Sequence, residues 1–239
     1  MFDFLLSNDK KLEKARLVLI ESLKNGDIDY LLKQMNSEEI YSPLLKKKRQ
    51  TETSNTDDIS WYAYRRAETL NSPSEKQKLI ERLNSESDEI KRKHIYFCLA
   101  HYCKNTLDKS LFNFLMDSLE QEKDNNCRLS VLIGISYMPK SSDLNIEPLK
   151  KLTKTRNRDL KVNSIIALQQ TNDKEVEDLL LPLFIDTKDT HIKSVITWTL
   201  ESTGTMKSIP ILEEAFKKTR DYGLRGYIER AIEKIKNRE

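Results

Sequence analysis

A short polar motif recurs along this chain at almost constant spacing. An acidic or amide residue is followed four positions later by a basic one, in the pairs Asp88/Arg92, Asp124/Arg128, Asn157/Lys161, Asp189/Lys193 and Asp221/Arg225. The basic members lie 36, 33, 32 and 32 residues apart. A fixed period of this length is typical of stacked helical hairpins, in which each hairpin buries its apolar face only against its neighbours. The period therefore predicts the architecture before any other signal is considered.

The residues that follow each basic position repeat one pattern of side-chain sizes. Three positions on lie Ile95, Val131, Ser164, Ile196 and Ile228. Six positions on lie the small residues Cys98, Gly134, Ala167, Thr199 and Ala231, and seven positions on the large aliphatic residues Leu99, Ile135, Leu168, Leu200 and Ile232. Spacings of three, four and seven place these residues on one stripe of an α-helix. We call these five helices the B helices, and the stripe predicts their buried side.

A second set of helices, the A helices, is expected between the B helices. Apolar residues at helical spacing predict them over 73–85, 106–121, 144–155, 173–186 and 205–219. Pro182 falls inside one of them and is expected to kink or split it. The chain is therefore predicted to be an all-α, right-handed α-solenoid of about five to six stacked antiparallel helix pairs.

Residues 1–72 do not show the repeat in register, so a helical capping region is expected ahead of a solenoid at 73–239. Its helices are predicted at 9–24, at 27–36 after a candidate cap, Asp27, and at 60–70 after Asp58. The basic cluster 46–49 precedes a polar loop at 50–58. The cluster is either a phosphate-binding or targeting patch or part of a solvated loop, and the loop is the favoured interpretation.

The repeat resembles the HEAT-like repeats, particularly the short variety found in bilin-lyase subunits. The resemblance covers about 73–236 and is carried best by Asp189, Ile192, Lys193, Ile196, Thr199 and Leu200, and by Asn157, Leu160, Lys161, Ser164, Ala167 and Leu168. The chain departs from the family where a Gly would follow the Leu, and has Ala100, Ser136, Gln169, Glu201 and Glu233 instead. The resemblance implies that the acidic and basic members of the five motifs form a ladder between successive repeats. The alternative is that each acid caps its own helix and each base is solvated.

Another set of positions lies away from the buried stripe of the B helices. Five residues after each basic residue come Phe97, Ile133, Ile166, Trp198 and Arg230, four of which are apolar. In HEAT-like proteins the corresponding helices line the concave surface, so the resemblance implies a groove that binds a partner's helix or loop. Trp198 is the leading candidate for a binding hot spot. The alternative is that these side chains pack sideways between adjacent B helices.

Composition excludes several classes of protein. The chain has 239 residues, 38% of them apolar and 33% charged, and its net charge of +3 comes from interspersed bases and acids. Such a balance disfavours nucleic acid as a partner. No apolar run approaches the ~20 residues that span a bilayer, so no membrane segment is expected. The three cysteines show no disulfide pattern, which favours the reducing cytoplasm.

No catalytic motif is present in the sequence, which lacks a phosphate-binding Gly-rich loop, a nucleophile elbow and a His-Glu metalloprotease motif. His94, Cys98 and His101 share a helical face and could ligate zinc or copper, but Cys98 occupies the small core position, which favours packing. Neither a metal nor a cofactor is therefore expected.

The leading hypothesis is a non-enzymatic protein–protein interaction scaffold that acts in the cytoplasm. The alternative is a DNA-binding protein like the HEAT-type alkylation-repair glycosylases, in which Trp198 would face DNA. A third hypothesis is a bilin-lyase-like subunit.

Overall fold

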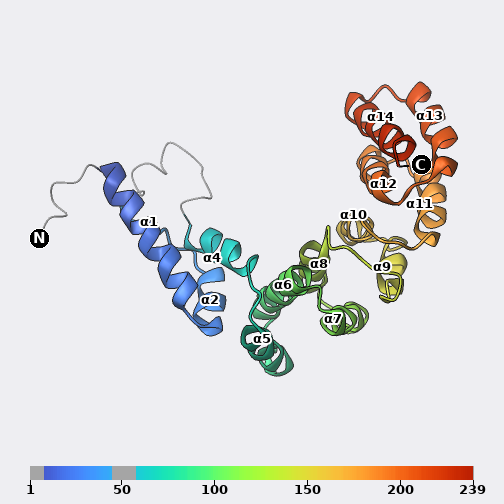
Figure 1. Ribbon diagram of the computed structural model, residues 1–239. Coiled ribbons are helices and arrows are strands. Elements are labelled where there is room, and N and C mark those ends of the chain that lie inside the picture. The colour runs from blue at the N-terminus through green and yellow to red at the C-terminus, as the bar shows by residue number, and fades with distance from the viewer. Residues whose placement is uncertain (1–7, 45–57, 239) are drawn as a thin grey trace, which may run out of the picture. The chain divides into compact units, whose positions relative to one another are not determined.

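The computed structural model describes residues 8–44 and 58–238 (Figure 1). Over these residues the regular structure is helical, apart from two isolated β-bridges, Ile40 with Asp58 and Lys140 with Thr171. The chain divides into two compact units, Met1–Thr106 and Leu107–Glu239, here called unit 1 and unit 2. The basic cluster 46–49 and the loop residues 50–57 lie outside the described residues. The predicted all-α class is confirmed.

Unit 1 contains five described helices. They are α1 (Asn8–Asn25), α2 (Ile28–Met35), α4 (Ile59–Ala67), α5 (Pro73–Ser85) and α6 (Glu89–Thr106). The Asp27 carboxylate caps α2 by accepting a hydrogen bond of 2.8 Å from the amide of Tyr30. Helix α2 packs against α4, α5 and α6, and α1 packs against α4. The predicted boundary between 72 and 73 stays a prediction, and in this grouping α5 and α6 share a unit with the N-terminal helices.

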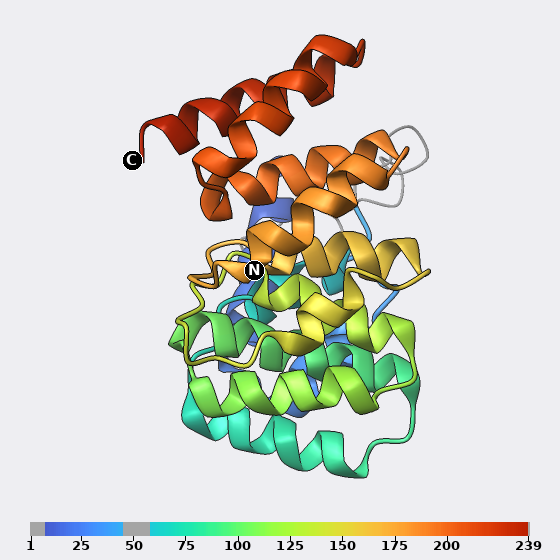
Figure 2. The same ribbon diagram turned by 90° about the vertical axis from the view of Figure 1, so that its right-hand side faces the viewer.

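Unit 2 is built from four successive helix pairs, which Figure 2 shows from a second direction. The A helices are α7 (Lys109–Gln121), α9 (Glu147–Leu152), α11 (Glu175–Asp186) and α13 (Ile209–Lys218), the last preceded by the 3-10 turn η3 (Met206–Ser208). The B helices are α8 (Asn125–Ile135), α10 (Arg158–Ala167), α12 (Thr190–Thr203) and α14 (Tyr222–Lys236). Each B helix contacts the next, α8 with α10, α10 with α12 and α12 with α14. Each pair therefore covers the apolar side of its neighbour.

The predicted apolar stripe forms the core of both units. All five residues at the third position and all five at the sixth position after the basic residue are buried. At the seventh position Leu99, Ile135, Leu168 and Leu200 are 0% exposed. Ile232, the fifth, is only half-buried, because no described helix follows α14 to cover it. The cysteines Cys98, Cys103 and Cys127 are buried and unbridged.

Several A helices differ from the predicted ranges for local reasons. Helix α9 is shorter than 144–155, since Pro148 at its first turn fixes a late start. The stretch 205–219 divides into η3 and α13, where Pro210 again lies in the first turn. Helix α11 runs unbroken through Pro182, so the helix is not split there. Pro182 has no amide hydrogen to donate to the carbonyl four residues before it. Pro182 is exposed, so water can donate to that carbonyl instead.

Across residues 8–44 and 58–238, no helix combines the length and the apolar character needed to cross a membrane.

Candidate functional site

The acidic or amide member of each repeated motif begins a B helix. Side-chain oxygens accept hydrogen bonds from the backbone amides of the first helical turn, at 2.9 Å for Asp88, 2.8 Å for Asp124, 3.0 Å for Asn157, 3.2 Å for Asp189 and 2.8 Å for Asp221. These bonds satisfy amides that have no partner within the helix. The five residues therefore act as N-caps, and a ladder between repeats stays a prediction.

Four of the five basic members contact residues of their own repeat. Arg128 Nε donates to the carbonyl of Leu119 on α7 at 3.1 Å, and Arg92 donates to the carbonyl of Ser87 at 2.6 Å. The remaining contacts pair a cation with an aromatic ring, at 5.2 Å for Lys193 over Phe184 and 4.2 Å for Arg225 over Phe216. Lys161 is half-buried on α10. Three of these bases thus hold a B helix against the A helix before it.

Among the ion pairs that join successive repeats of unit 2, one pairs a motif acid with a base outside the motif. Arg158, in the first turn of α10, places its Nε 2.8 Å from Oδ2 of Asp189, the cap of α12. The hydrogen bond from Arg158 lowers the pKa of Asp189 to about 2, and the amides of His191 and Ile192 act in the same direction. Asp189 therefore both caps its helix and links two repeats.

The predicted groove residues fall in both units. Ile133 is 48% exposed, Ile166 and Trp198 are half-buried, and Arg230 is exposed, on α8, α10, α12 and α14 respectively. Because these helices are successive neighbours, the four residues form one row in unit 2. Phe97 lies on α6 in unit 1, where its ring packs against Tyr64 at 4.9 Å and His101 at 4.3 Å between centroids.

Two tyrosines extend the row beyond the residues named from the sequence. Tyr137 is 40% exposed, and its ring centroid lies 5.6 Å from that of Trp198. Tyr227 is 36% exposed, with the Arg230 guanidinium 5.0 Å from its ring. The i, i+3 spacing of Tyr227 and Arg230 could have indicated a shared face, but Tyr137 has a φ of 62°, which no spacing rule anticipates. We call Ile133, Tyr137, Ile166, Trp198, Tyr227 and Arg230 the unit 2 row.

A buried carboxylate fixes the end of the unit 2 row. Glu201 on α12 has a side chain that is 5% exposed, and it accepts hydrogen bonds from Arg230 Nε at 2.6 Å and Lys234 Nζ at 2.7 Å. Arg238 also donates to the backbone carbonyl of Glu201 at 3.0 Å. Both oxygens of this carboxylate are paired with cations, which offsets its desolvation. Arg230 is thereby held in one orientation on α14.

The candidate metal ligands on α6 are buried. Cys98 is 0% exposed, and its Sγ lies 3.7 Å from the Sδ of Met35. Burial raises the pKa of the Cys98 thiol and lowers the pKa of His94 and of His101 to about 4, so that both imidazoles are neutral at pH 7. Within the described ranges, no group of three or more His, Cys, Asp or Glu side chains is placed to hold a metal ion.

Two solved structures and one family model are similar to this chain. A designed armadillo repeat protein is 15% identical, with 87% of this chain and 100% of that chain covered and a TM-score of 0.48. A crystal structure of YibA from E. coli is 14% identical, with 92% and 96% covered and a TM-score of 0.44. No curated protein matches the sequence. Residues 146–233, from the start of α9 into α14, match the family model of HEAT repeats, and this part of the chain is HEAT-like.

Proposed function

We propose that this chain is a non-enzymatic protein-binding module and that the unit 2 row is its contact surface. The observation that carries the proposal is the set of large apolar side chains at equivalent places on α8, α10 and α12, of which Ile133 is exposed and Ile166 and Trp198 are half-buried. Ile133 is 48% and Tyr137 40% exposed, and both lie in the row that contains Trp198. Clustered exposed apolar residues on a folded surface are typical of binding sites, whereas single ones need no explanation.

The scaffold beneath the row favours binding by shape. Helices α8, α10, α12 and α14 pack through a buried stripe, so the exposed side chains stand on fixed backbones. A rigid surface loses little conformational entropy when a partner binds. Aromatic residues such as Trp198 and Tyr137 contribute large contact areas and are enriched among hot spots. The row therefore suits an apolar helix or loop of a partner protein, and three unbridged cysteines support a reducing compartment as the place of binding.

The proposal is tested by affinity capture from cells of the source organism with the wild type and the Ile133→Asp variant. Ile185→Asp is the matched control, because Ile185 is 58% exposed on the A helix α11. A partner protein should be retained by the wild type and by Ile185→Asp and lost from Ile133→Asp. Purified partner should then bind Trp198→Ala at least about tenfold more weakly, as expected for a hot spot.

Equal retention of that protein by Ile133→Asp and the wild type would refute the role of the row. Circular dichroism of each variant, compared with the wild type, separates lost binding from lost folding. Ile133 is exposed, so its substitution is expected to leave the fold intact.

A further inference from the structure

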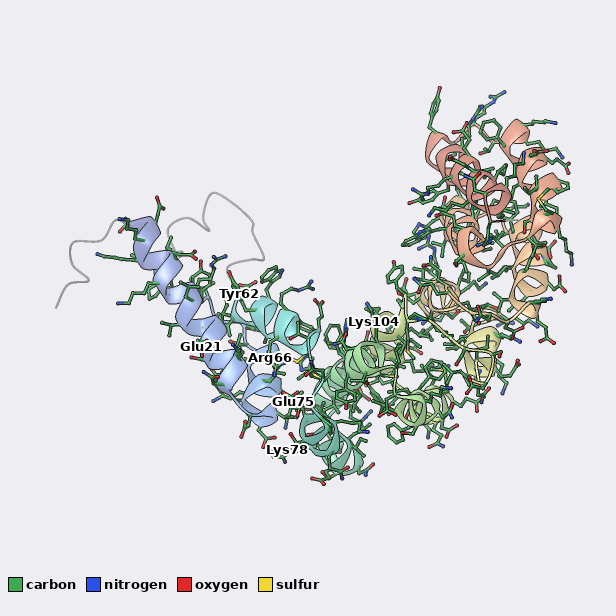
Figure 3. All side chains as sticks on the ribbon, viewed as in Figure 1. Glu21, Tyr62, Arg66, Glu75, Lys78 and Lys104 are labelled. Atoms are coloured by element: carbon green, nitrogen blue, oxygen red, sulfur yellow. The ribbon has the colours of Figure 1, made fainter. Side chains whose placement is uncertain are left out.

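A hollow of about 620 Å³ lies between α1 and α4 in unit 1. One face of α1 contributes Arg16, Ile20, Leu23 and Lys24, which are spaced four, three and one residues apart. One face of α4 and the residues after it contribute Trp61, Tyr62, Arg65, Arg66 and Thr69. Figure 3 labels Tyr62 and Arg66 on α4 and Glu21 on the neighbouring α1. We call this hollow the α1–α4 groove.

The floor of the α1–α4 groove is apolar and aromatic. Ile20 is 40% exposed, and Leu23 beside it is buried. Trp61 is half-buried, and its ring packs edge-on against Tyr62 at 4.9 Å between centroids. A floor of this kind can bury one or two large apolar side chains of a ligand.

The residues that line the groove include four cations and no carboxylate. Across the whole chain the 41 basic residues are nearly balanced by 38 acidic ones, so a lining with Arg16, Lys24, Arg65 and Arg66 and no carboxylate departs from the average surface. Such a concentration of one charge selects for a ligand of the opposite charge.

These cations differ in how firmly they are held. Arg16 pairs with Glu13 and Arg65 with Glu68, each at 2.6 Å, but both arginine side chains are more than 40% exposed. Exposed ion pairs contribute little to stability, so an incoming carboxylate can replace Glu13 or Glu68. Lys24 has no ion pair with any described residue, whereas Arg66 is fixed by Glu75 at 2.6 Å in a less exposed setting.

We propose that the α1–α4 groove binds a short acidic peptide segment that carries a large apolar side chain. The apolar side chain packs on Ile20 and Trp61, and carboxylates on either side of it meet Lys24, Arg16 and Arg65. The Arg65 guanidinium, 5.6 Å from the Trp61 ring centroid, joins the two kinds of contact. This site is separate from the unit 2 row and does not depend on it.

The surroundings of the groove favour a short segment over a nucleic acid. Glu13 and Glu21 lie on α1 on either side of Arg16, and Glu68 lies just after α4. A polyanion that extended beyond the hollow would meet these carboxylates. A peptide can place its acids opposite the cations and neutral residues elsewhere.

The test is a selection from a displayed library of random dodecapeptides on the full-length chain, after depletion on the Lys24→Glu/Arg65→Glu variant. Enriched peptides should carry Asp or Glu beside a Trp, Phe or Leu. In fluorescence polarisation, a labelled enriched peptide should bind the Lys24→Glu/Arg65→Glu and Trp61→Ala variants about tenfold or more weakly. Lys33→Glu, which changes an exposed lysine of α2, should bind like the wild type.

Several outcomes would overturn the proposal. They are the absence of any enriched peptide, enrichment of peptides without acids, and equal binding by the charge-reversed variant. A peptide that is lost in Trp198→Ala but retained in Trp61→Ala binds the unit 2 row and also counts against it. A labelled oligothymidylate bound by the wild type and lost in Trp61→Ala would assign the groove to nucleic acid instead. Circular dichroism verifies that each variant is folded.

Discussion

Lys140 is a buried lysine that bridges two repeats of unit 2. It is 1% exposed, and its ammonium donates to the carbonyls of Met138 at 2.7 Å and Gln169 at 3.3 Å, which lie beyond the ends of α8 and α10. Lys140→Met should lower the free energy of unfolding by about 2–3 kcal/mol, because buried carbonyls lose their donor. Lys151→Met, at an exposed lysine, should leave the free energy of unfolding almost unchanged. Equal denaturant midpoints for the two variants would contradict this role.

Leu200 and Ile232 occupy the same repeat position in different surroundings. Leu200 is 0% exposed beneath α14, whereas Ile232 on α14 is half-buried. Leu200→Ala should destabilise by about 2–5 kcal/mol, because it leaves a cavity in packed surroundings. Ile232→Ala should lower the free energy of unfolding clearly less than Leu200→Ala does, since neighbouring side chains and solvent can fill the space that the smaller side chain leaves. Urea melts of the two variants compare them directly, and similar losses would show that the C-terminal pair is as well covered as the others.

At the scale of helices, the stability of each B helix depends on the N-cap residue that precedes it. Asp189→Ala removes a cap and should cost about 1 kcal/mol, whereas Asp189→Asn keeps the cap and should cost less. The pKa of Asp189 lies below its unfolded value, so its contribution is present above the unfolded pKa and is lost as pH falls toward about 2. Urea melts between pH 5 and pH 2 should therefore show a smaller loss of stability for Asp189→Asn than for the wild type. If the free energy of unfolding fell by the same amount in both proteins, the pKa of Asp189 would not contribute to the pH dependence of stability.

The sequence predicted the B helices well because their signal is local. Caps and the stripe at positions three, six and seven lie within one helix, so spacing alone identifies the buried side of α8, α10 and α12. The place of Tyr137 in the unit 2 row was not predicted, because it depends on a left-handed backbone conformation at a residue other than glycine. The α1–α4 groove escaped prediction because its two faces lie far apart in the sequence and meet only through packing. The burial of Lys140 could not be predicted from residue spacing, since its ammonium donates to backbone carbonyls, which every residue has.

At the scale of the molecule, the two units should respond differently to acid. His94 and His101 are in unit 1, and burial lowers the pKa of each to about 4, below the unfolded value of 6.5. The unfolded chain therefore binds protons first, and the stability of unit 1 should fall as pH drops from about 6.5 to about 4. Each unit has one tryptophan, Trp61 in unit 1 and Trp198 in unit 2, so the Trp198→Phe and Trp61→Phe variants report on them separately.

Between pH 7 and pH 5, the denaturant midpoint followed by Trp61 should fall more than the midpoint followed by Trp198. Replacing both histidines with Leu should flatten the pH response of the Trp61 signal. An equal fall in both midpoints would contradict a response confined to unit 1.

Because all three cysteines are buried, their reactivity reports how often the chain unfolds locally. An alkylating reagent in native buffer can react only when a unit transiently exposes its interior, since Cys98 and Cys103 lie inside unit 1 and Cys127 inside unit 2. The rate of alkylation at each cysteine, measured by mass spectrometry, would therefore give the frequency of local unfolding in each unit.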